Sequence, residues 1–248
     1  VFTAADGLTD VLSIDSSWSV LVDRLSQAAS SAGSVDRASA LWMAVASIQY
    51  DELGETPAAI RTLQRVIKIH PRHLDALERL ATLFESTESW HEAAATMEQL
   101  LAAAPDNTRV GRVMVRLSRL YRERLGTPEK AHRHIEAALA VDPTDPVALH
   151  ELSLVHEATG NLDDALTVAR RLLEVGGGAA QSNGLLRIGQ LEHATGNVEA
   201  AKAALRDAVV LEGASGQALG VFGSLCETPE DWRTLASALD AHEPADEK

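Results

Sequence analysis

The sequence is poor in residues on which several classes of protein depend. Cys226 is the only cysteine among 248 residues, which excludes an intrachain disulfide and any metal site built from cysteines. Aromatic residues make up only 4% of the chain, which argues against a β-sandwich or β-barrel. No apolar run reaches the length of about 18 residues that a membrane-spanning helix needs. These absences favour a protein of closely packed helices.

Positive charge is also scarce. The chain has 22 Lys and Arg against 36 Asp and Glu, a formal net charge of -14. A general binder of nucleic acid or of anionic membranes carries the opposite sign, so we expect neither partner. Arginine greatly outnumbers lysine, a bias that favours a bacterial source with a high-GC genome.

The sequence does contain a spacing that repeats. After Gly126, small or apolar residues follow at offsets of 5, 9 and 12, and Pro143 stands at 17. Those three offsets trace one face of a 3.6-residue helix, and the proline ends it. The series, written with its closing residue, reads Gly126, Ala131, Ile135, Ala138, Pro143; Gly54, Ala59, Leu63, Val66, Pro71; Gly160, Ala165, Ala169, Leu172, Gly177; and Gly196, Ala201, Leu205, Ala208, Gly213. Four occurrences identify an internal repeat.

A second pattern precedes each turn. Seven residues before the glycine stands a small residue beside an apolar one, as at Ser153 and Gly189, because paired helices come close there. Four residues before it, Tyr50, His156 and Glu192 share one position, which Tyr121 takes with one extra residue inserted. Two further units turn at Glu88 and Glu230 without glycine, so that the predicted turns fall at residues 16, 54, 88, 126, 160, 196 and 230.

Cap residues predict where the second helix of each pair begins. Hydroxyl or amide side chains that can accept a backbone N–H precede these helices. They are Thr56, Ser89 (in a capping box with Glu92), Thr127, Asn161, Asn197 and Thr228.

Together these features closely resemble the tetratricopeptide repeat (TPR) family, whose repeats have a period near 34 residues. The resemblance implies an all-α solenoid, a right-handed superhelix of antiparallel helix pairs. We expect a TPR-like array of about six repeats over 36–241, after a degenerate unit with its connecting loop over 1–35 and before a polar tail over 242–248. Trp18, Trp90 and Trp232 take equivalent positions, so we expect them to pack inside the array.

No catalytic or metal-binding pattern stands out in the sequence. His132 and His134 point to different sides of a helix, and His150 and His156 lack the i, i+4 spacing at which two histidines share a metal. The run from Gly176 to Gly178 lacks the Lys-Ser/Thr pair that follows in a phosphate-binding loop. We therefore expect no enzyme and no cofactor.

One cluster of charge suggests a binding surface. Arginines recur on the first helix of the central unit, opposite its apolar stripe, and the resemblance implies that this face lines the concave groove where partners dock. The candidate partner-binding residues are Arg79, Arg112, Arg116, Arg119, Arg122, His150 and Arg187. Guanidinium groups there could hold a carboxylate or phosphate of an acidic or phosphorylated partner. The alternatives are a solvated face paired with nearby acids, and an apolar docking patch at Leu41, Val45 and Ile48.

The resemblance favours a non-enzymatic scaffold or adaptor that binds a segment of a partner protein in its groove. The alternative is a regulatory or targeting region of a larger enzyme or signalling protein, to which the absence of a methionine at Val1 also points. Self-association through the end repeats, at Leu219, Val221 and Phe222, is a third possibility. Without a visible signal peptide or membrane span, we expect a cytoplasmic protein.

Overall fold

The computed structural model describes residues 18–104, 107–175, 177–211 and 216–242, and these residues are almost entirely helical. They form thirteen α-helices and one short π-helix, with no strand among them. Predicted features at residues 1–17, the closing Pro105 and Gly213, and the tail beyond His242 lie outside the described residues. The all-α fold class is confirmed. No helix within the described ranges has the length and apolar character needed to cross a bilayer.

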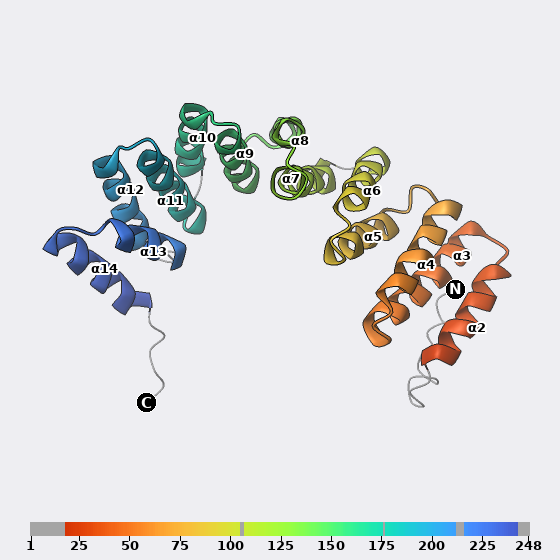
Figure 1. The fold of residues 1–248 in the computed structure, drawn as a ribbon. Helices are drawn as coiled ribbons and strands as arrows, with labels where there is room; N and C mark the ends of the chain where they lie inside the picture. Colours follow the sequence, from red (N-terminus) through yellow and green to blue (C-terminus); the bar gives the residue numbers. More distant parts are fainter. Residues whose placement is uncertain (1–17, 105–106, 176, 212–215, 243–248) are drawn as a thin grey trace, which may run out of the picture. The chain divides into compact units, whose positions relative to one another are not determined.

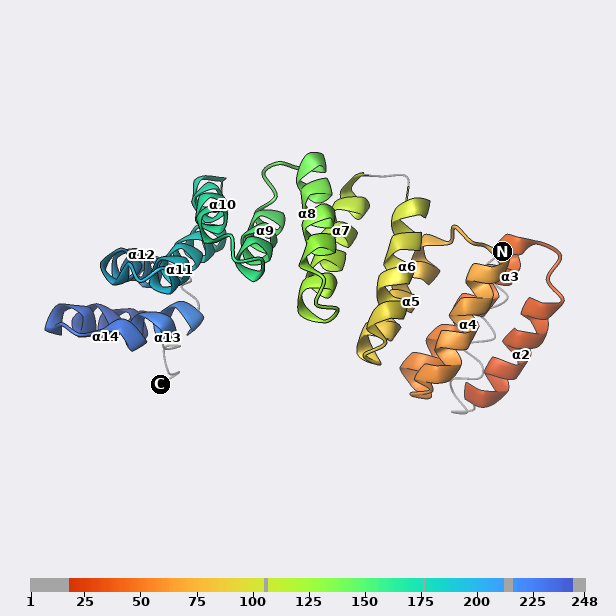
Figure 2. The ribbon, with the colours of Figure 1, turned by 45° about the horizontal axis from the view of Figure 1, so that its top comes forward.

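The helices follow one another in pairs (Figure 1, Figure 2). After α2 (Trp18–Ser30), the pairs are α3 (Val35–Ser47), which continues into the π-helix η1 (Ile48–Glu52), with α4 (Thr56–Ile69); α5 (Leu74–Ser86) with α6 (Trp90–Ala103); α7 (Asn107–Glu123) with α8 (Pro128–Val141); α9 (Pro146–Ala158) with α10 (Leu162–Val175); α11 (Ala179–Ala194) with α12 (Val198–Val210); and α13 (Gly216–Leu225) with α14 (Pro229–His242).

The chain divides into two compact units, residues 1–113 and residues 114–248. The division falls inside α7, between Val113 and Met114. Within each unit, most described helices pack against their neighbours in sequence, and α14 also packs against α12, as expected for a solenoid, where no single central core forms.

The predicted turn residues take the left-handed backbone conformation that a tight helix–helix turn requires. Gly54, Gly126, Gly160 and Gly196 have φ between 58° and 84°. Glu88 takes the same conformation, with φ 56°, although it has a side chain. Five of the predicted turns therefore lie where the repeat spacing placed them.

The small residues at the repeated offsets lie in the closest helix–helix contacts. Ala131 and Ala165 are fully buried, as predicted. A Cβ added to Gly189 would lie 2.5 Å from Cγ of Leu205 on the paired helix. Ser153, at the same position one pair earlier, is fully buried and donates its hydroxyl to the carbonyl of Ala165 at 3.1 Å.

The predicted caps of the second helices are mostly wrong. No side-chain cap forms at Ser89, Thr127 or Asn197, and Thr56 lies inside α4, which Glu55 precedes. At these caps ψ lies between 62° and 73°, whereas it is 152° at Ser34, whose hydroxyl does cap α3. The tight turn fixes this ψ, and its backbone N–H groups bond backward instead: Ser89 N to the Phe84 carbonyl at 2.8 Å, and Asn197 N to the Glu192 carbonyl at 2.8 Å. Thr228 is an exception, since its Oγ1 accepts the N–H of Asp231.

The predicted turn at Glu230 is also wrong, because α14 begins at Pro229. The buried residues of α14 fit the repeat offsets only if they are counted from residue 226: Asp231 at 5, Leu235 at 9 and Ala238 at 12. Phe222 then takes the aromatic position four residues before the turn, and it is fully buried. The shift follows from the end of α13 at Leu225, which places the last turn 30 residues after Gly196 instead of 34. It also turns Trp232 outward, against the prediction that it packs.

Candidate functional site

Side chains of successive first helices contact one another at a spacing close to one repeat. In the first unit, Arg79 of α5 donates to the Ser47 hydroxyl of α3. Arg109 of α7 contacts Asp75 and Glu78 of α5, with N–O distances of 3.4 and 3.6 Å. In the second unit, similar contacts join α7 to α9 and α9 to α11. The first helices of each unit therefore share one face, as the groove interpretation requires.

On this face, a buried glutamate engages the predicted arginines of the second unit. Glu151 of α9 is fully buried, and its two carboxylate oxygens accept from Nε and Nη2 of Arg122 at 2.9 and 3.0 Å. Arg122 also contacts Glu123, and its side chain is only 14% exposed. Arg119 lies farther from Glu151, at 3.7 Å, and remains 52% exposed. Arg122 thus forms a structural ion pair with Glu151, while Arg119 still presents its guanidinium to solvent.

Arg187 of α11 is held in the same way. It donates to the Glu157 carboxylate at 2.9 Å and to the Ser153 hydroxyl at 3.3 Å, and its side chain is 5% exposed. Arg187 also donates to the amide oxygen of Gln190 on its own helix. Its charge therefore joins α11 to α9 and is scarcely open to a ligand.

His150 lies among these arginines. Burial and the positive charges of Arg187, Arg119 and Arg122 lower the pKa of its imidazole below the ordinary value of 6.5. Its Nδ1 is buried and has no hydrogen-bond partner among the described residues. The structure thus brings Arg119, Arg122 and Arg187 near His150, with Arg119 and Arg122 on Glu151 and Arg187 on Glu157. We call Arg119, Arg122, His150 and Arg187 the α7–α9–α11 cluster.

The remaining predicted arginines lie elsewhere. Arg116 is half-buried in the second unit. Arg112 and Arg79 are exposed and belong to the first unit, so the predicted strip is divided between the two units. Only the members of the α7–α9–α11 cluster therefore lie together.

The alternative apolar patch is not a surface. Val45 and Ile48 are buried and Leu41 is half-buried, in a region where α2 and α4 both pack against α3 and η1. Side chains this buried offer no surface to a partner, so the prediction of an exposed patch is wrong.

A break in helical geometry exposes an aromatic residue nearby. The last residues of the first helix form η1, in which the N–H of Leu53 bonds to the carbonyl of Ile48, five residues back. This wider turn accommodates an extra residue and rotates Tyr50, which is 43% exposed. In the following pair, Phe84 stands four residues before the turn and is buried. Single π-helical turns are frequent at functional sites.

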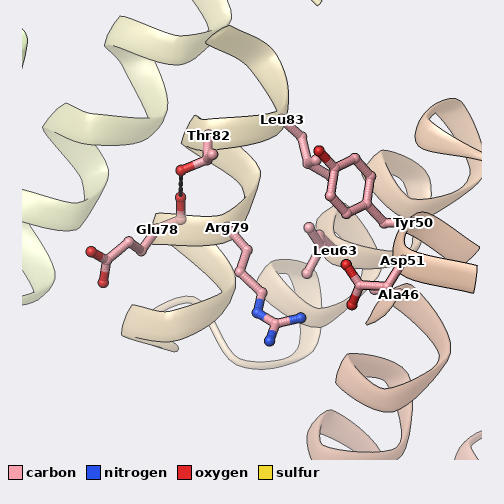
Figure 3. A pocket seen from close by; sticks show the side chains of 8 residues that line it. All are labelled: Ala46, Tyr50, Asp51, Leu63, Glu78, Arg79, Thr82 and Leu83. Atoms are coloured by element: carbon pink, nitrogen blue, oxygen red, sulfur yellow. Dashed lines mark hydrogen bonds between the residues drawn. The ribbon is translucent and has the colours of Figure 1, made fainter. Parts of the chain in front are cut away.

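Tyr50 forms one wall of a pocket of about 210 Å³ between α3, η1, α4 and α5 (Figure 3). Its ring lies beside Leu83, with Leu63 below, and the guanidinium of Arg79 extends into the space beneath Asp51. Glu78 points the other way, consistent with its contact to Arg109. The eight lining residues are Ala46, Tyr50, Asp51, Leu63, Glu78, Arg79, Thr82 and Leu83.

The pocket has apolar walls and a polar rim of both charges, but no chemical machinery. Within the described residues no three His, Cys, Asp or Glu side chains are placed to hold a metal ion. At about 210 Å³ it is smaller than the roughly 300–1,000 Å³ of sites that enclose drug-sized ligands. Such a pocket suits one side chain of a bound segment.

Sequence reasoning found Arg79 but missed Tyr50 and Asp51 as lining residues. Arg109 was missed as well, although it stands one repeat after Asp75, the residue that it contacts.

Family models of the tetratricopeptide repeat match residues 52–117 and 120–183, together more than half of the chain. No curated protein matches the sequence.

Several solved structures share the fold. A tetratricopeptide repeat protein from Parabacteroides merdae is 14% identical, with a TM-score of 0.62 over 98% of this chain and 95% of that one. PilF of Pseudomonas aeruginosa is 20% identical, with a TM-score of 0.59 over 86% and 95%. YrrB, described as a TPR protein with an unusual peptide-binding site, is 19% identical, with a TM-score of 0.57 over 73% and 89%. At these identities the similarity concerns the fold alone.

Proposed function

Because the chain belongs to the tetratricopeptide repeat family, we propose that it is a non-enzymatic scaffold that binds a segment of a partner protein at the Tyr50–Arg79 pocket. The solvent exposure of Tyr50 carries this proposal. An aromatic ring at a position that is buried in the following pair loses packing within its own fold, and contact with a partner would recover it.

The lining residues define what the pocket would accept. The ring of Tyr50 with Leu63 and Leu83 offers an apolar surface for one aliphatic or aromatic side chain. Arg79 offers guanidinium donors to a backbone carbonyl or a carboxylate next to that side chain. Asp51 places an acid on the same rim, so a uniformly acidic segment would be repelled there. We therefore expect a segment with one large apolar residue and a flanking acceptor.

A second candidate partner is an acidic or phosphorylated segment at the α7–α9–α11 cluster. The buried, unpartnered Nδ1 of His150 and the open guanidinium of Arg119 support it. The positive charges of Arg119, Arg122 and Arg187 lower the pKa of His150, and a bound anion would offset them. His150 would then take up a proton when the anion binds. The affinity of this site should then increase as the pH falls from 7.5 to 6, whereas binding at the Tyr50–Arg79 pocket should change little.

One experiment tests both candidates. A random peptide library displayed on phage is selected against the full chain, and the selected peptides are titrated calorimetrically against variants of each site. We expect Tyr50→Ala and Arg79→Ala each to weaken binding by about ten- to thirtyfold, because each removes an anchor costing on the order of 1.5–2 kcal/mol. Arg119→Ala should leave the affinity unchanged unless the selected peptides are acidic.

Two exposed arginines on second helices serve as matched controls. Arg61 of α4 and Arg133 of α8 carry the same charge as Arg79 and Arg119 but do not line the pocket or belong to the cluster. Their alanine variants should bind like the wild type. Equal affinities for all variants, or a library that yields no binder, would contradict the proposed function.

A further inference from the structure

The helix α14 presents an apolar stripe that no described element covers. Trp232 is 53% exposed and Leu239 is 47% exposed, and Ala236 lies exposed between them. Their spacing of i, i+4 and i+7 places all three on one face of the helix. The adjoining face, with Leu235 and Ala238, packs into the core formed with α12 and α13.

The equivalent positions of the earlier helix pairs show the usual environment of this face. Counted from residue 226, Trp232 and Leu239 stand at offsets 6 and 13 of their pair. In the five earlier pairs the residues at offset 6 are Ile60, Ala94, His132, Leu166 and Lys202, and those at offset 13 are Ile67, Leu101, Leu139, Leu173 and Val209. All ten are buried or half-buried.

A following helix covers these positions where the contacts are described. Leu166 of α10 packs in one cluster with Leu191 of α11. A Cβ on Gly184 of α11 would lie 3.0 Å from the backbone of Leu173. Offsets 6 and 13 therefore form a helix-docking surface, which is open only on α14 among the described pairs.

We propose that α14 docks on α14 of a second copy of this chain, antiparallel about a two-fold axis. If Trp232, Ala236 and Leu239 form the d, a and d positions of a heptad, Arg233 and Asp240 both occupy e positions. In an antiparallel pair of helices, e positions face e positions. Arg233 of each copy then meets Asp240 of the other, and the surface is self-complementary, as a two-fold interface requires.

The charges of α14 fit this arrangement and disfavour a parallel one. A parallel pair would place Arg233 and Asp240 opposite g positions, one of which is Leu235, already buried in its own unit. Asp240 stands in the last turn of α14, where the helix dipole disfavours an acid. No ion-pair partner for Arg233 or Asp240 occurs within the described residues, and a second copy supplies both.

Sedimentation velocity of the full chain over a range of concentrations tests the proposal. We expect a reversible monomer–dimer equilibrium. Trp232→Ala should raise its dissociation constant about tenfold or more, because a tryptophan that becomes buried in an interface is a typical hot spot. Arg233→Asp and Asp240→Arg should each weaken the dimer, since each places like charges together. The double variant Arg233→Asp/Asp240→Arg should restore it, because the exchanged charges again meet opposite partners.

Val147→Ala, which truncates an exposed apolar residue of α9, is the control and should dimerise like the wild type. Circular dichroism establishes that each variant is folded. A monomer at every concentration overturns the proposal and leaves the face to another partner or to further residues of a longer protein. A dimer that is insensitive to Trp232→Ala, or a double variant as weak as the single ones, overturns the proposed geometry. None of these outcomes bears on the Tyr50–Arg79 pocket.

Discussion

At the scale of single residues, backbone conformation decides which turns are strained. Gly160 has φ 78°, and a Cβ added to it would have nothing within 4 Å, so only backbone strain opposes a side chain there. Glu88 takes φ 56° at the equivalent turn and carries a side chain. A left-handed conformation costs an L-residue roughly 1–2 kcal/mol, so Glu88 retains a strain that glycine removes in four other pairs.

Glu88→Gly should therefore stabilise the protein and Gly160→Ala should destabilise it, each by about 1 kcal/mol. Thermal unfolding followed by circular dichroism measures both changes. Glu88→Ala is the control, because it removes the exposed carboxylate but keeps a Cβ at the same φ. If Glu88→Ala stabilises as much as Glu88→Gly, the carboxylate and not the backbone is the cause.

At the scale of helices, the sequence predicts pairs well where the repeat spacing is regular. Four glycines and Glu88 mark real turns, since backbone conformation and packing both depend on residue type there. The prediction of the last pair was wrong because it applied a 34-residue step, whereas α13 already ends at Leu225. Cap residues were mispredicted for a different reason: the tight turn fixes ψ, and a local sequence rule does not include that constraint.

The candidate site was less predictable than the fold. Arg119, Arg122, His150 and Arg187 do gather on one face, but sequence could not show that buried Glu151 and half-exposed Glu157 neutralise two of the arginines. These ion pairs join residues about one repeat apart in sequence, and whether they form depends on the rotamers of both side chains. The exposure of Tyr50 was not predicted, because the π-helix moves this aromatic residue from a packing position to the surface.

Ion pairs join the last helix pair to α12, and the stability of this pair therefore depends on pH. Asp231 is buried, and its carboxylate accepts from Arg206 at 2.6 Å and from the N–H of Thr228 at 3.2 Å. The Arg206 contact and these backbone bonds hold the pKa of Asp231 well below its ordinary value of 3.8. Since the folded state binds the proton more weakly than the unfolded chain, this stabilisation is complete above pH 3.8 and is lost progressively at lower pH.

Asp231→Asn should accordingly lower the melting temperature at pH 7, and the difference from the wild type should shrink as the pH falls from 5 to 2.5. Thermal unfolding at several pH values measures this convergence. Asp23→Asn is a suitable control, because Asp23 is exposed on α2 and has no ion-pair partner among the described residues. A difference between wild type and Asp231→Asn that stays constant over this range would show that the carboxylate does not act through its charge.

At the scale of the whole molecule, stability is distributed along the chain. Most described helices contact their sequence neighbours, and residues 1–113 and 114–248 form separate compact units. In such an array a local perturbation acts on the repeat that carries it and on the adjacent interfaces, and little beyond. A scaffold of this kind can lose order in one unit while a pocket in the other unit remains intact.

Ala165→Leu tests this directly. Ala165 is fully buried where α10 meets α9, so a larger side chain overpacks that contact and should cost about 1–3 kcal/mol. Hydrogen exchange measured by mass spectrometry should show reduced protection in α9, α10 and α11 and unchanged protection in α3, α4 and α5, which line the Tyr50–Arg79 pocket. Ala59→Leu, at the equivalent buried position of α4, should give the reverse pattern. If either variant lowers protection equally throughout the described helices, the two units unfold together, and the pocket depends on the second unit for its stability.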